Sequence, residues 1–243
     1  MKLRSFLLLV ACLFLVLAAA APGQEKLVAD FKKFGGIAKM DKDKNITSLT
    51  LSSDKVTDDA LKPLKDLTRL TKLAVSSAKV SDAGLAGLQG LTKLLELDLH
   101  STPITDATLD QVKGLTALKS LDLSDTKITG KGLANIAELT KLQTLILTNT
   151  QVDDAGLEHL KKLTALQKLH LYKGKITDKG LASLKGLTKL ELLELGSTAV
   201  TDKGLPLLKD LSKLKTISLS DTTVTEAGVK GLQKAIPGVD VVK

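Results

Sequence analysis

Carboxylates and imidazoles occur in the middle of the chain at spacings that could support catalysis or metal binding. Asp98 and Asp122 lie 24 residues apart, and His100 follows Asp98 by two residues. Further along, His170 and Glu194 are again 24 residues apart. Two carboxylates about 5 Å apart are the pair that retaining glycosidases use, and imidazole nitrogen together with carboxylate oxygen is a zinc ligand set. Whether these side chains meet depends on the elements that carry them.

Those elements are set by a repeat of fixed length. Residues 46–237 consist of eight copies of a 24-residue unit, without insertion or deletion. We number each copy from its first apolar residue, so that Leu94 is position 1 and Asp98 is position 5 of copy three. Positions 1, 4, 6, 11, 16, 19 and 22 are apolar in every copy. A repeat of this length is typical of a solenoid, in which neighbouring copies stack to bury apolar faces that none could bury alone.

Two hydrophobic periodicities divide each copy. Positions 4 and 6 alternate with polar neighbours, which predicts a strand with one buried face. Positions 16, 19 and 22 step by three, which predicts a short helix with one apolar side. Because strands of neighbouring copies lie about 4.8 Å apart, equivalent positions form rows across the sheet.

The exposed rows are at positions 3, 5 and 7, whose side chains point away from the core. In the outer copies these rows carry mostly small, uncharged residues, whereas the middle copies carry charged, aromatic and exposed apolar residues. Apolar side chains beside a tyrosine and surrounded by polar groups are typical of a binding hot spot, although drift on a solvated strand face would give the same residues. The candidate partner-binding residues are Glu96, Asp98, His100, Asp122, Asp125, Ile146, His170, Tyr172, Leu192 and Glu194.

Catalysis and metal binding are not expected on this surface. Asp98 and Asp122 should be roughly 5 Å apart, but an open sheet supplies no cleft to exclude water or raise one carboxyl pKa. His170 should lie three strands, or roughly 14 Å, from Asp98, too far to share an ion with Asp98 and His100. The sequence also lacks a phosphate-binding glycine loop, a cysteine pair, and the H-E-x-x-H and G-x-S-x-G motifs. We therefore expect no enzyme activity, no metal and no cofactor.

Hydroxyl and carboxyl residues also recur where each copy turns toward its helix. Position 9 is threonine in five copies, position 12 is threonine or serine in seven, and position 13 is aspartate in six. The threonine at position 9 can satisfy backbone groups at the end of the strand. A threonine N-cap followed by aspartate in the first helical turn complements the helix dipole, so capping is the expected role. Calcium is not expected, because each copy supplies only one such carboxylate.

The repeat resembles the leucine-rich repeat family, whose consensus is L-x-x-L-x-L-x-x-N/C-x-L. It is most similar to the cysteine-containing subtype, with threonine in place of the cysteine, as the segments 80–85, 176–181 and 200–205 illustrate. The resemblance, to a secreted bacterial type of such proteins, implies an α/β leucine-rich-repeat solenoid, curved as an arc or horseshoe. It further implies a parallel sheet on the concave face, short helices on the convex face, and binding of other molecules, usually proteins, by the concave face.

The N-terminal 21 residues resemble a secretory signal peptide. Lys2 and Arg4 precede an apolar run, and alanines follow at residues 18–21. This layout predicts export to the periplasm, cell envelope or exterior. Residues 9–12 also match a lipoprotein cleavage box in which Cys12 would be lipidated, but the apolar run continues beyond Cys12, which departs from that pattern. Membrane attachment is expected only through the signal peptide or through such a lipid.

A stacked core needs a cap at each end. We expect an N-terminal cap of helix plus strand at residues 22–45, the eight repeats at residues 46–237, and a closing strand at residues 238–243.

The net charge of +8 raises the question of an anionic partner. Nucleic acid is not expected, because the chain is predicted to be exported and has one tyrosine, four phenylalanines and no tryptophan for base stacking. The leading hypothesis is an exported, non-catalytic recognition module, expected to be monomeric, that binds a protein through the concave face. The alternative is a structural or envelope-associated protein that holds an anionic polymer through peripheral lysines at positions 10, 20 and 24.

Overall fold

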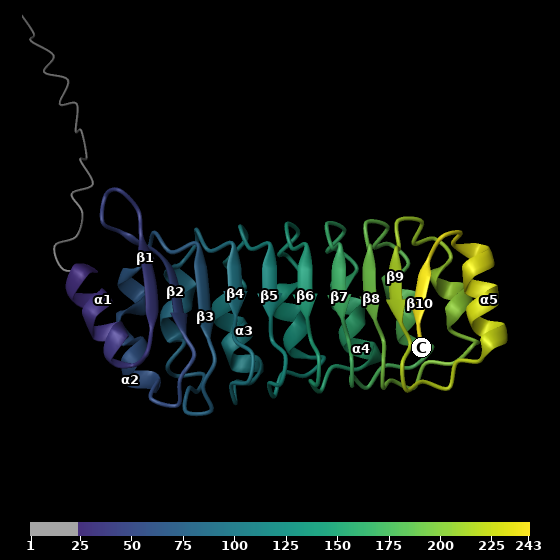
Figure 1. The fold of residues 1–243 in the computed structure, drawn as a ribbon, viewed down its shortest axis with the longest axis horizontal. Coiled ribbons are helices and arrows are strands. Elements are labelled where there is room, and N and C mark those ends of the chain that lie inside the picture. Colours follow the sequence, from purple (N-terminus) through teal and green to yellow (C-terminus); the bar gives the residue numbers. More distant parts are fainter. Residues whose placement is uncertain (1–23) are drawn as a thin grey trace, which may run out of the picture.

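The computed structural model describes residues 24–243, so the predicted signal peptide and Cys12 lie outside the described residues. The described chain forms one ten-stranded sheet in which the strands follow each other in sequence order (Figure 1). The strands are β1 (Ile37–Met40), β2 (Ile46–Leu51), β3 (Lys72–Val75), β4 (Glu96–Asp98), β5 (Ser120–Asp122), β6 (Thr144–Ile146), β7 (Lys168–His170), β8 (Leu192–Glu194), β9 (Thr216–Ser218) and β10 (Asp240–Val242).

The eight copies contribute β2 to β9, which are all parallel and in register at equal repeat positions. Leu97 of β4, for example, pairs with Leu73 of β3 and with Leu121 of β5. From copy three onward the strands end at position 5, yet backbone bonds between copies continue beyond them. Leu99 N–H donates to the Asp122 carbonyl at 2.9 Å. Position 7 is therefore held in register as firmly as position 5.

The helical side of the solenoid is built largely from 3₁₀ helices, where α-helices were expected. The α-helical segments in the repeats are α2 (Asp58–Leu61), α3 (Asp106–Val112), α4 (Asp154–Leu157) and α5 (Glu226–Ala235). The 3₁₀ segments are η1 (Lys62–Asp66), η2 (Ala86–Gly90), η3 (Gly132–Ile136), η4 (Glu158–Leu160), η5 (Gly180–Leu184) and η6 (Leu205–Leu208). The step of three between positions 16, 19 and 22 explains this, because a 3₁₀ helix has three residues per turn and keeps such positions on one side.

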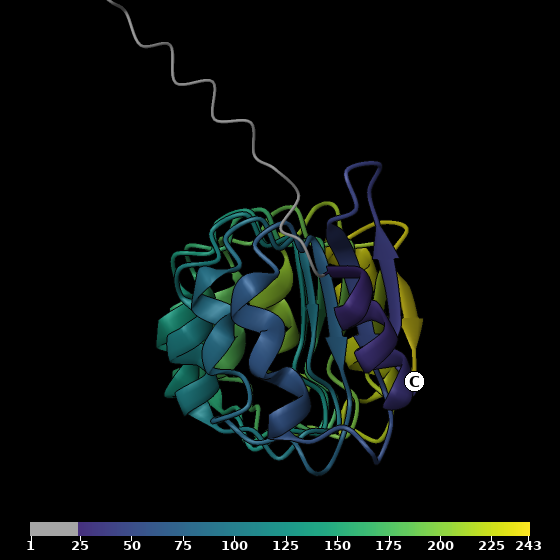
Figure 2. The ribbon, with the colours of Figure 1, turned by 90° about the vertical axis from the view of Figure 1, so that its left-hand side faces the viewer.

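The apolar repeat positions form one continuous core between the sheet and the helices. All of them are buried except Val229 and Ala235 in the last helix, where Ile236 is buried instead. Seen along the solenoid, both ends curve toward the sheet side, so the sheet lines the concave face of an arc and the helices its convex face (Figure 2). The α/β leucine-rich-repeat solenoid expected from the sequence is confirmed.

Threonine at position 9 has the expected role at the end of the strand. In five copies its hydroxyl donates to the carbonyl of position 6 in the same copy, as Thr126 does to Leu123 at 2.6 Å. The turn before it is tight: from copy three onward, position 8 adopts positive φ with non-glycine residues, such as Asn149 at 53°.

The aspartate at position 13 has a different partner from the one expected. Its carboxylate accepts two hydrogen bonds from position 12 of the next copy, one from the backbone N–H and one from the hydroxyl. Asp178, for example, accepts both from Thr201 at 2.7 Å. The same pair of bonds, which we call the carboxylate junction, forms at six of the seven boundaries between copies. The predicted capping by position 12 is present as well: in every copy but the first, its side-chain oxygen accepts a backbone N–H from two or three residues further on.

At two junctions the bonding also shows in the carboxyl pKa. Hydrogen bonds from the Thr225 side chain and backbone lower the pKa of Asp202 below its usual value. Burial raises the pKa of Asp82, but hydrogen bonds from Thr108 and Thr105 outweigh it and leave the pKa below its usual value. The bonds thus stabilise the ionised carboxylate that joins copy two to copy three.

Both ends of the core are covered. At the N-terminal end α1 (Gln24–Lys33) packs Phe31 against the first copy, and β1 pairs with β2 in antiparallel orientation. The Gln24 side chain accepts a hydrogen bond from Ile46 N–H at 2.5 Å. At the other end α5 leads into β10, which adds to β9 in parallel. Within residues 24–243 we find no helix with the length and apolar character needed to cross a membrane.

Candidate recognition surface on the concave sheet

Five candidate residues form one unbroken row across the concave sheet, which we call the central row. They are the last residues of β4 to β8: Asp98, Asp122, Ile146, His170 and Glu194. Each is the direct register partner of the next. All five are half-buried, so the row lies in the floor of the concave face while its polar atoms remain accessible.

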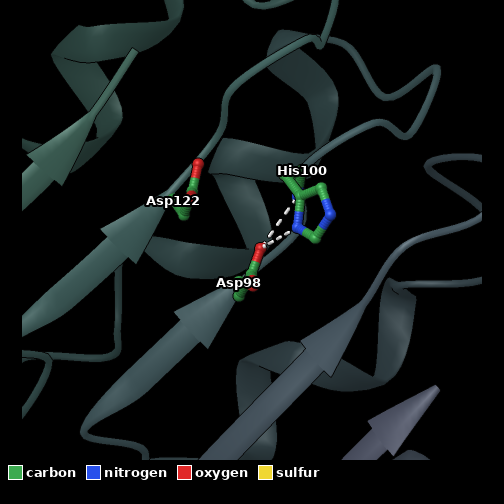
Figure 3. Close-up of side chains that lie close together, drawn as sticks. All are labelled: Asp98, His100 and Asp122. Atoms are coloured by element: carbon green, nitrogen blue, oxygen red, sulfur yellow. Dashed lines mark hydrogen bonds and ion pairs between the residues drawn. The ribbon is translucent and has the colours of Figure 1, made fainter. Parts of the chain in front are cut away.

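At the copy-three end of the row, two aspartates and a histidine converge (Figure 3). The Nδ1 atom of His100 lies 2.7 Å from Asp98 Oδ1, and the same oxygen accepts the His100 backbone N–H at 3.0 Å. Asp122 is held in the same manner, because its Oδ1 accepts the backbone N–H of Ser124 at 2.9 Å and the Ser124 hydroxyl at 2.5 Å. One potential ligand atom from each of Asp98, His100 and Asp122 lies within 4.8 Å of the others.

This grouping differs from the set considered from the sequence. There, an ion shared with His170 was excluded by distance, whereas the structure brings Asp122 beside Asp98 and His100. Ser124 was not among the candidate residues, although its place at position 7 of the copy after His100 was a usable signal.

Ile146 occupies the centre of the row, between Asp122 and His170. It is half-buried, so part of an apolar side chain remains open to a partner between two polar flanks. Leu192 at position 3 of β8 is half-buried as well, one row away.

A second histidine–carboxylate pair lies at the other end of the row. His170 Nδ1 and Glu194 Oε2 are 2.6 Å apart on adjacent strands. Beside them, Tyr172 lies against Gly196, where an added Cβ would come within 2.9 Å of the Tyr172 ring. The Lys173 ammonium lies 5.4 Å from the ring centroid. Sequence reasoning missed Gly196, although its glycine at position 7 next to a tyrosine was a signal that a ring occupies the space.

Two candidate residues lie away from the central row. Glu96, at position 3 of β4, is exposed and forms an ion pair with Lys72 at 2.7 Å. Asp125 is in the turn after β5, with a φ of 56°, and its carboxylate accepts a bond from Asn149 at 2.7 Å. It lines a shallow hollow of about 500 Å³ along the rim together with residues such as Lys127. The surface is therefore a floor of five strands with a polar rim at the ends of the strands.

The lysines of the periphery are partly neutralised. Lys113 pairs with Asp110 at 3.4 Å, Lys185 with Asp210 at 3.5 Å, and Lys161 with Glu158. These pairs reduce the positive charge that the convex side presents.

Comparisons with known proteins agree with this architecture. A leucine rich repeat family model matches residues 92–152. No curated protein sequence matches the chain. Among solved structures, the chain is similar to internalin C2 of Listeria monocytogenes, with 23% identity and a TM-score of 0.69 over 90% of this chain and 92% of that one.

Two other solved structures are similar over a smaller part of their own length. Internalin F of Listeria monocytogenes has 24% identity and a TM-score of 0.58, over 80% of this chain and 58% of that one. The ectodomain of the plant membrane receptor kinase GASSHO1/SCHENGEN3 from Arabidopsis thaliana, in complex with CASPARIAN STRIP INTEGRITY FACTOR 2, has 17% identity and a TM-score of 0.55, over 77% of this chain and 25% of that one. By its repeat sequence, this family match and the shared fold, the chain has the leucine-rich-repeat architecture.

Proposed function

We propose that the protein is an exported, non-catalytic recognition module that binds a protein partner through the concave face of copies three to seven. The observation that carries this proposal is the central row. The buried repeat positions are nearly uniform, as stacking requires. At position 5, in contrast, the outer copies carry the small residues Thr50, Ala74 and Ser218, and the middle copies carry charged or larger ones: Asp98, Asp122, Ile146, His170 and Glu194. Stacking does not explain this departure, because these side chains face solvent.

The chemistry of the row fits protein recognition better than catalysis. Half-buried carboxylates and imidazoles flank the exposed part of Ile146, with Tyr172 close by, an arrangement typical of an interface centre. The row also lies on a broad, open arc, whereas enzymes enclose their substrates in clefts. The Arabidopsis ectodomain, which shares the fold, is described in complex with another factor, and this supports binding as one use of the fold.

Charge reversal on the central row tests the proposal. The purified chain, lacking residues 1–21, is used to capture partners from envelope extracts of its own cells, and captured proteins are identified by mass spectrometry. The double variant Asp98→Lys with Asp122→Lys should weaken capture by about 30-fold, the loss of about 2 kcal/mol expected for an interface centre.

The matched control reverses two carboxylates on the convex side, Asp110→Lys with Glu138→Lys. It changes the net charge by the same amount and should leave capture unchanged. Equal capture by all three proteins would refute binding through the concave face. Mass spectrometry of the chain isolated from cells also shows whether residues 1–21 are removed, as the export part of the proposal requires.

The alternative is an envelope-associated protein that holds an anionic polymer by its peripheral lysines. The ion pairs of Lys113, Lys161 and Lys185 count against it, because a polymer would have to displace bound carboxylates. Salt separates the two functions: exposed charges more than about 10 Å apart are screened at 0.1 M salt, so polymer binding weakens steeply with salt. Capture of a protein partner through packed apolar and hydrogen-bonded contacts should persist at high salt.

A further inference from the structure

Three side chains at the copy-three end of the central row have the geometry of a metal site. Asp98 and Asp122 are register partners on adjacent strands, and His100 lies two residues beyond Asp98 on the same face. Their potential ligand atoms all lie within 4.8 Å of one another. We propose that Asp98, His100 and Asp122 bind a divalent transition metal ion, with zinc as the best fit. The site shares these residues with the proposed protein-binding surface, but zinc binding does not require a protein partner.

The donor atoms select the class of ion. One imidazole nitrogen with two carboxylate oxygens suits zinc and related transition metals. Calcium takes six to eight oxygen ligands and is not favoured by imidazole, so three donors of this kind do not suit it. Three protein ligands on an open surface also leave a coordination position for water or for a group of a partner.

Both carboxylates are already oriented. Asp98 Oδ1 accepts the backbone N–H of His100, and Asp122 Oδ1 accepts the backbone N–H of Ser124. In the part of the chain that the structure describes, the Oδ2 atoms of these two residues have no hydrogen-bond donor. The turns therefore fix the carboxylates and leave one oxygen of each free of hydrogen bonds.

The charge balance favours a cation at this place. Across residues 24–243, neither Asp98 nor Asp122 forms an ion pair with a lysine or arginine, although lysines are abundant. The neighbouring carboxylate Glu96 does have such a partner, Lys72. Like charges directly opposite on neighbouring strands repel, and a divalent ion between them removes that repulsion.

Binding the ion needs movement of side chains only. In tetrahedral coordination zinc lies about 2.0–2.2 Å from its nitrogen and oxygen ligands, so two ligands of one ion are about 3.4 Å apart. Side-chain rotations that move the ligand atoms by about an ångström bring the three atoms to that separation. His100 Nδ1 then exchanges its contact with Asp98 for the metal and keeps its ring proton on Nε2.

The His170–Glu194 pair provides a natural comparison on the same surface. It has the same imidazole–carboxylate contact, at 2.6 Å, but its row neighbour on β6 is Ile146, which has no ligand atom. A pair of donors binds zinc more weakly than three, so zinc should bind at the His100 end and not at the His170 end.

The test is titration of the chain lacking residues 1–21, free of any affinity tag, with zinc followed by calorimetry and with cobalt followed by visible absorption. We expect one ion per chain, and cobalt d–d bands whose intensity reports the coordination geometry and changes in His100→Ala. His100→Ala and Asp122→Asn should each lower zinc affinity by about tenfold or more, since even outer-shell changes at metal sites cost about 10–100-fold. His170→Ala and His159→Ala, the latter on the convex side, serve as matched controls and should keep the wild-type affinity.

Absence of zinc binding by the wild type would overturn the proposal. So would equal affinity in the wild type and in the His100→Ala, Asp122→Asn double variant, or loss of binding only with His170→Ala. Circular dichroism and thermal melts in EDTA establish that all variants are folded, because these side chains lie outside the core. Partner capture in EDTA separates this site from the proposed function, since either property can fail without the other.

Discussion

At the residue scale, the glycine at position 15 leaves room for the aspartate of the preceding copy. A Cβ added to Gly180 would lie 2.4 Å from Asp154 Oδ1, and the same holds for Gly204 against Asp178. Among the copies that follow an aspartate at position 13, only copy three lacks this glycine and has Thr108 instead. Thr108 donates its hydroxyl to Asp82 Oδ1 at 2.5 Å, so the larger residue bonds to the carboxylate. The motif T-D-x-G-L is therefore shared between neighbours, with the aspartate of one copy bound by the threonine and accommodated by the glycine of the next.

Gly180→Ala should destabilise the protein by about 1–3 kcal/mol, the usual cost of forcing an extra carbon into a packed site. The reason is that Asp154 must move and weaken its bonds to Thr177. Urea unfolding followed by circular dichroism measures the change. Gly186→Ala in the same copy is the control: an added Cβ there meets nothing within 4 Å, so stability should be unchanged or slightly higher. Equal stabilities of the two variants would contradict this account of position 15.

At the element scale, the boundary between copies four and five is built differently from the other six. Position 13 is Gly130 and position 12 of the next copy is Asp153, so the carboxylate junction is absent there. Asp153 instead accepts the Gly156 N–H of its own helix α4 at 3.0 Å. The backbones approach closely at this boundary, because a Cβ on Gly156 would lie 2.4 Å from the Gly130 Cα. A pair of glycines thus replaces a pair of hydrogen bonds.

A double-mutant cycle tests whether the glycine pair at this boundary can be replaced by the carboxylate junction of the other boundaries. Gly130→Asp alone should destabilise the protein, because the new carboxylate meets that of Asp153, whose Oδ1 would lie 2.2 Å from an added Cβ. Adding Asp153→Thr restores the usual partners, and we expect a favourable coupling of about 1–3 kcal/mol from urea unfolding of the four proteins. A coupling near zero would mean that the close Gly130–Gly156 contact, and not the polar pair, determines this boundary.

At the scale of the whole molecule, the stability of the arc is a sum of contributions from each copy and from the contacts between adjacent copies, because each copy packs only against its neighbours. The ends therefore depend on their caps. Phe31 of α1 is 2% exposed and covers the first copy, whose Ile46 N–H is bonded to Gln24. Phe31 does not contact residues of the distant copies.

Phe31→Ala should lower the free energy of unfolding of the N-terminal copies by about 3–5 kcal/mol, as for other buried phenylalanines. The solenoid should then unfold from its N-terminal end. Hydrogen exchange followed by mass spectrometry should show the largest loss of protection in copies one and two, decreasing toward copy eight. The control Leu207→Ala removes a side chain that is 40% exposed and should leave protection nearly unchanged. A uniform loss over all eight copies would instead show that the arc unfolds as a single cooperative unit.

The sequence by itself determined the number of copies, the buried positions and the rows of the exposed sheet, whereas the parallel orientation of the strands was implied by the family resemblance. It could do so because hydrophobic periodicity is a local property that every copy repeats. The tertiary structure decided which side chains meet across copies: Asp178 bonds to Thr201 of the next copy, Asp122 joins His100, and Asp125 turns away to the rim. These partners are about one repeat apart in the chain, so only the register and spacing of stacked copies bring their atoms within a few ångströms. The 3₁₀ character of most helical segments has its signal in the sequence, because apolar positions that step by three favour three residues per turn.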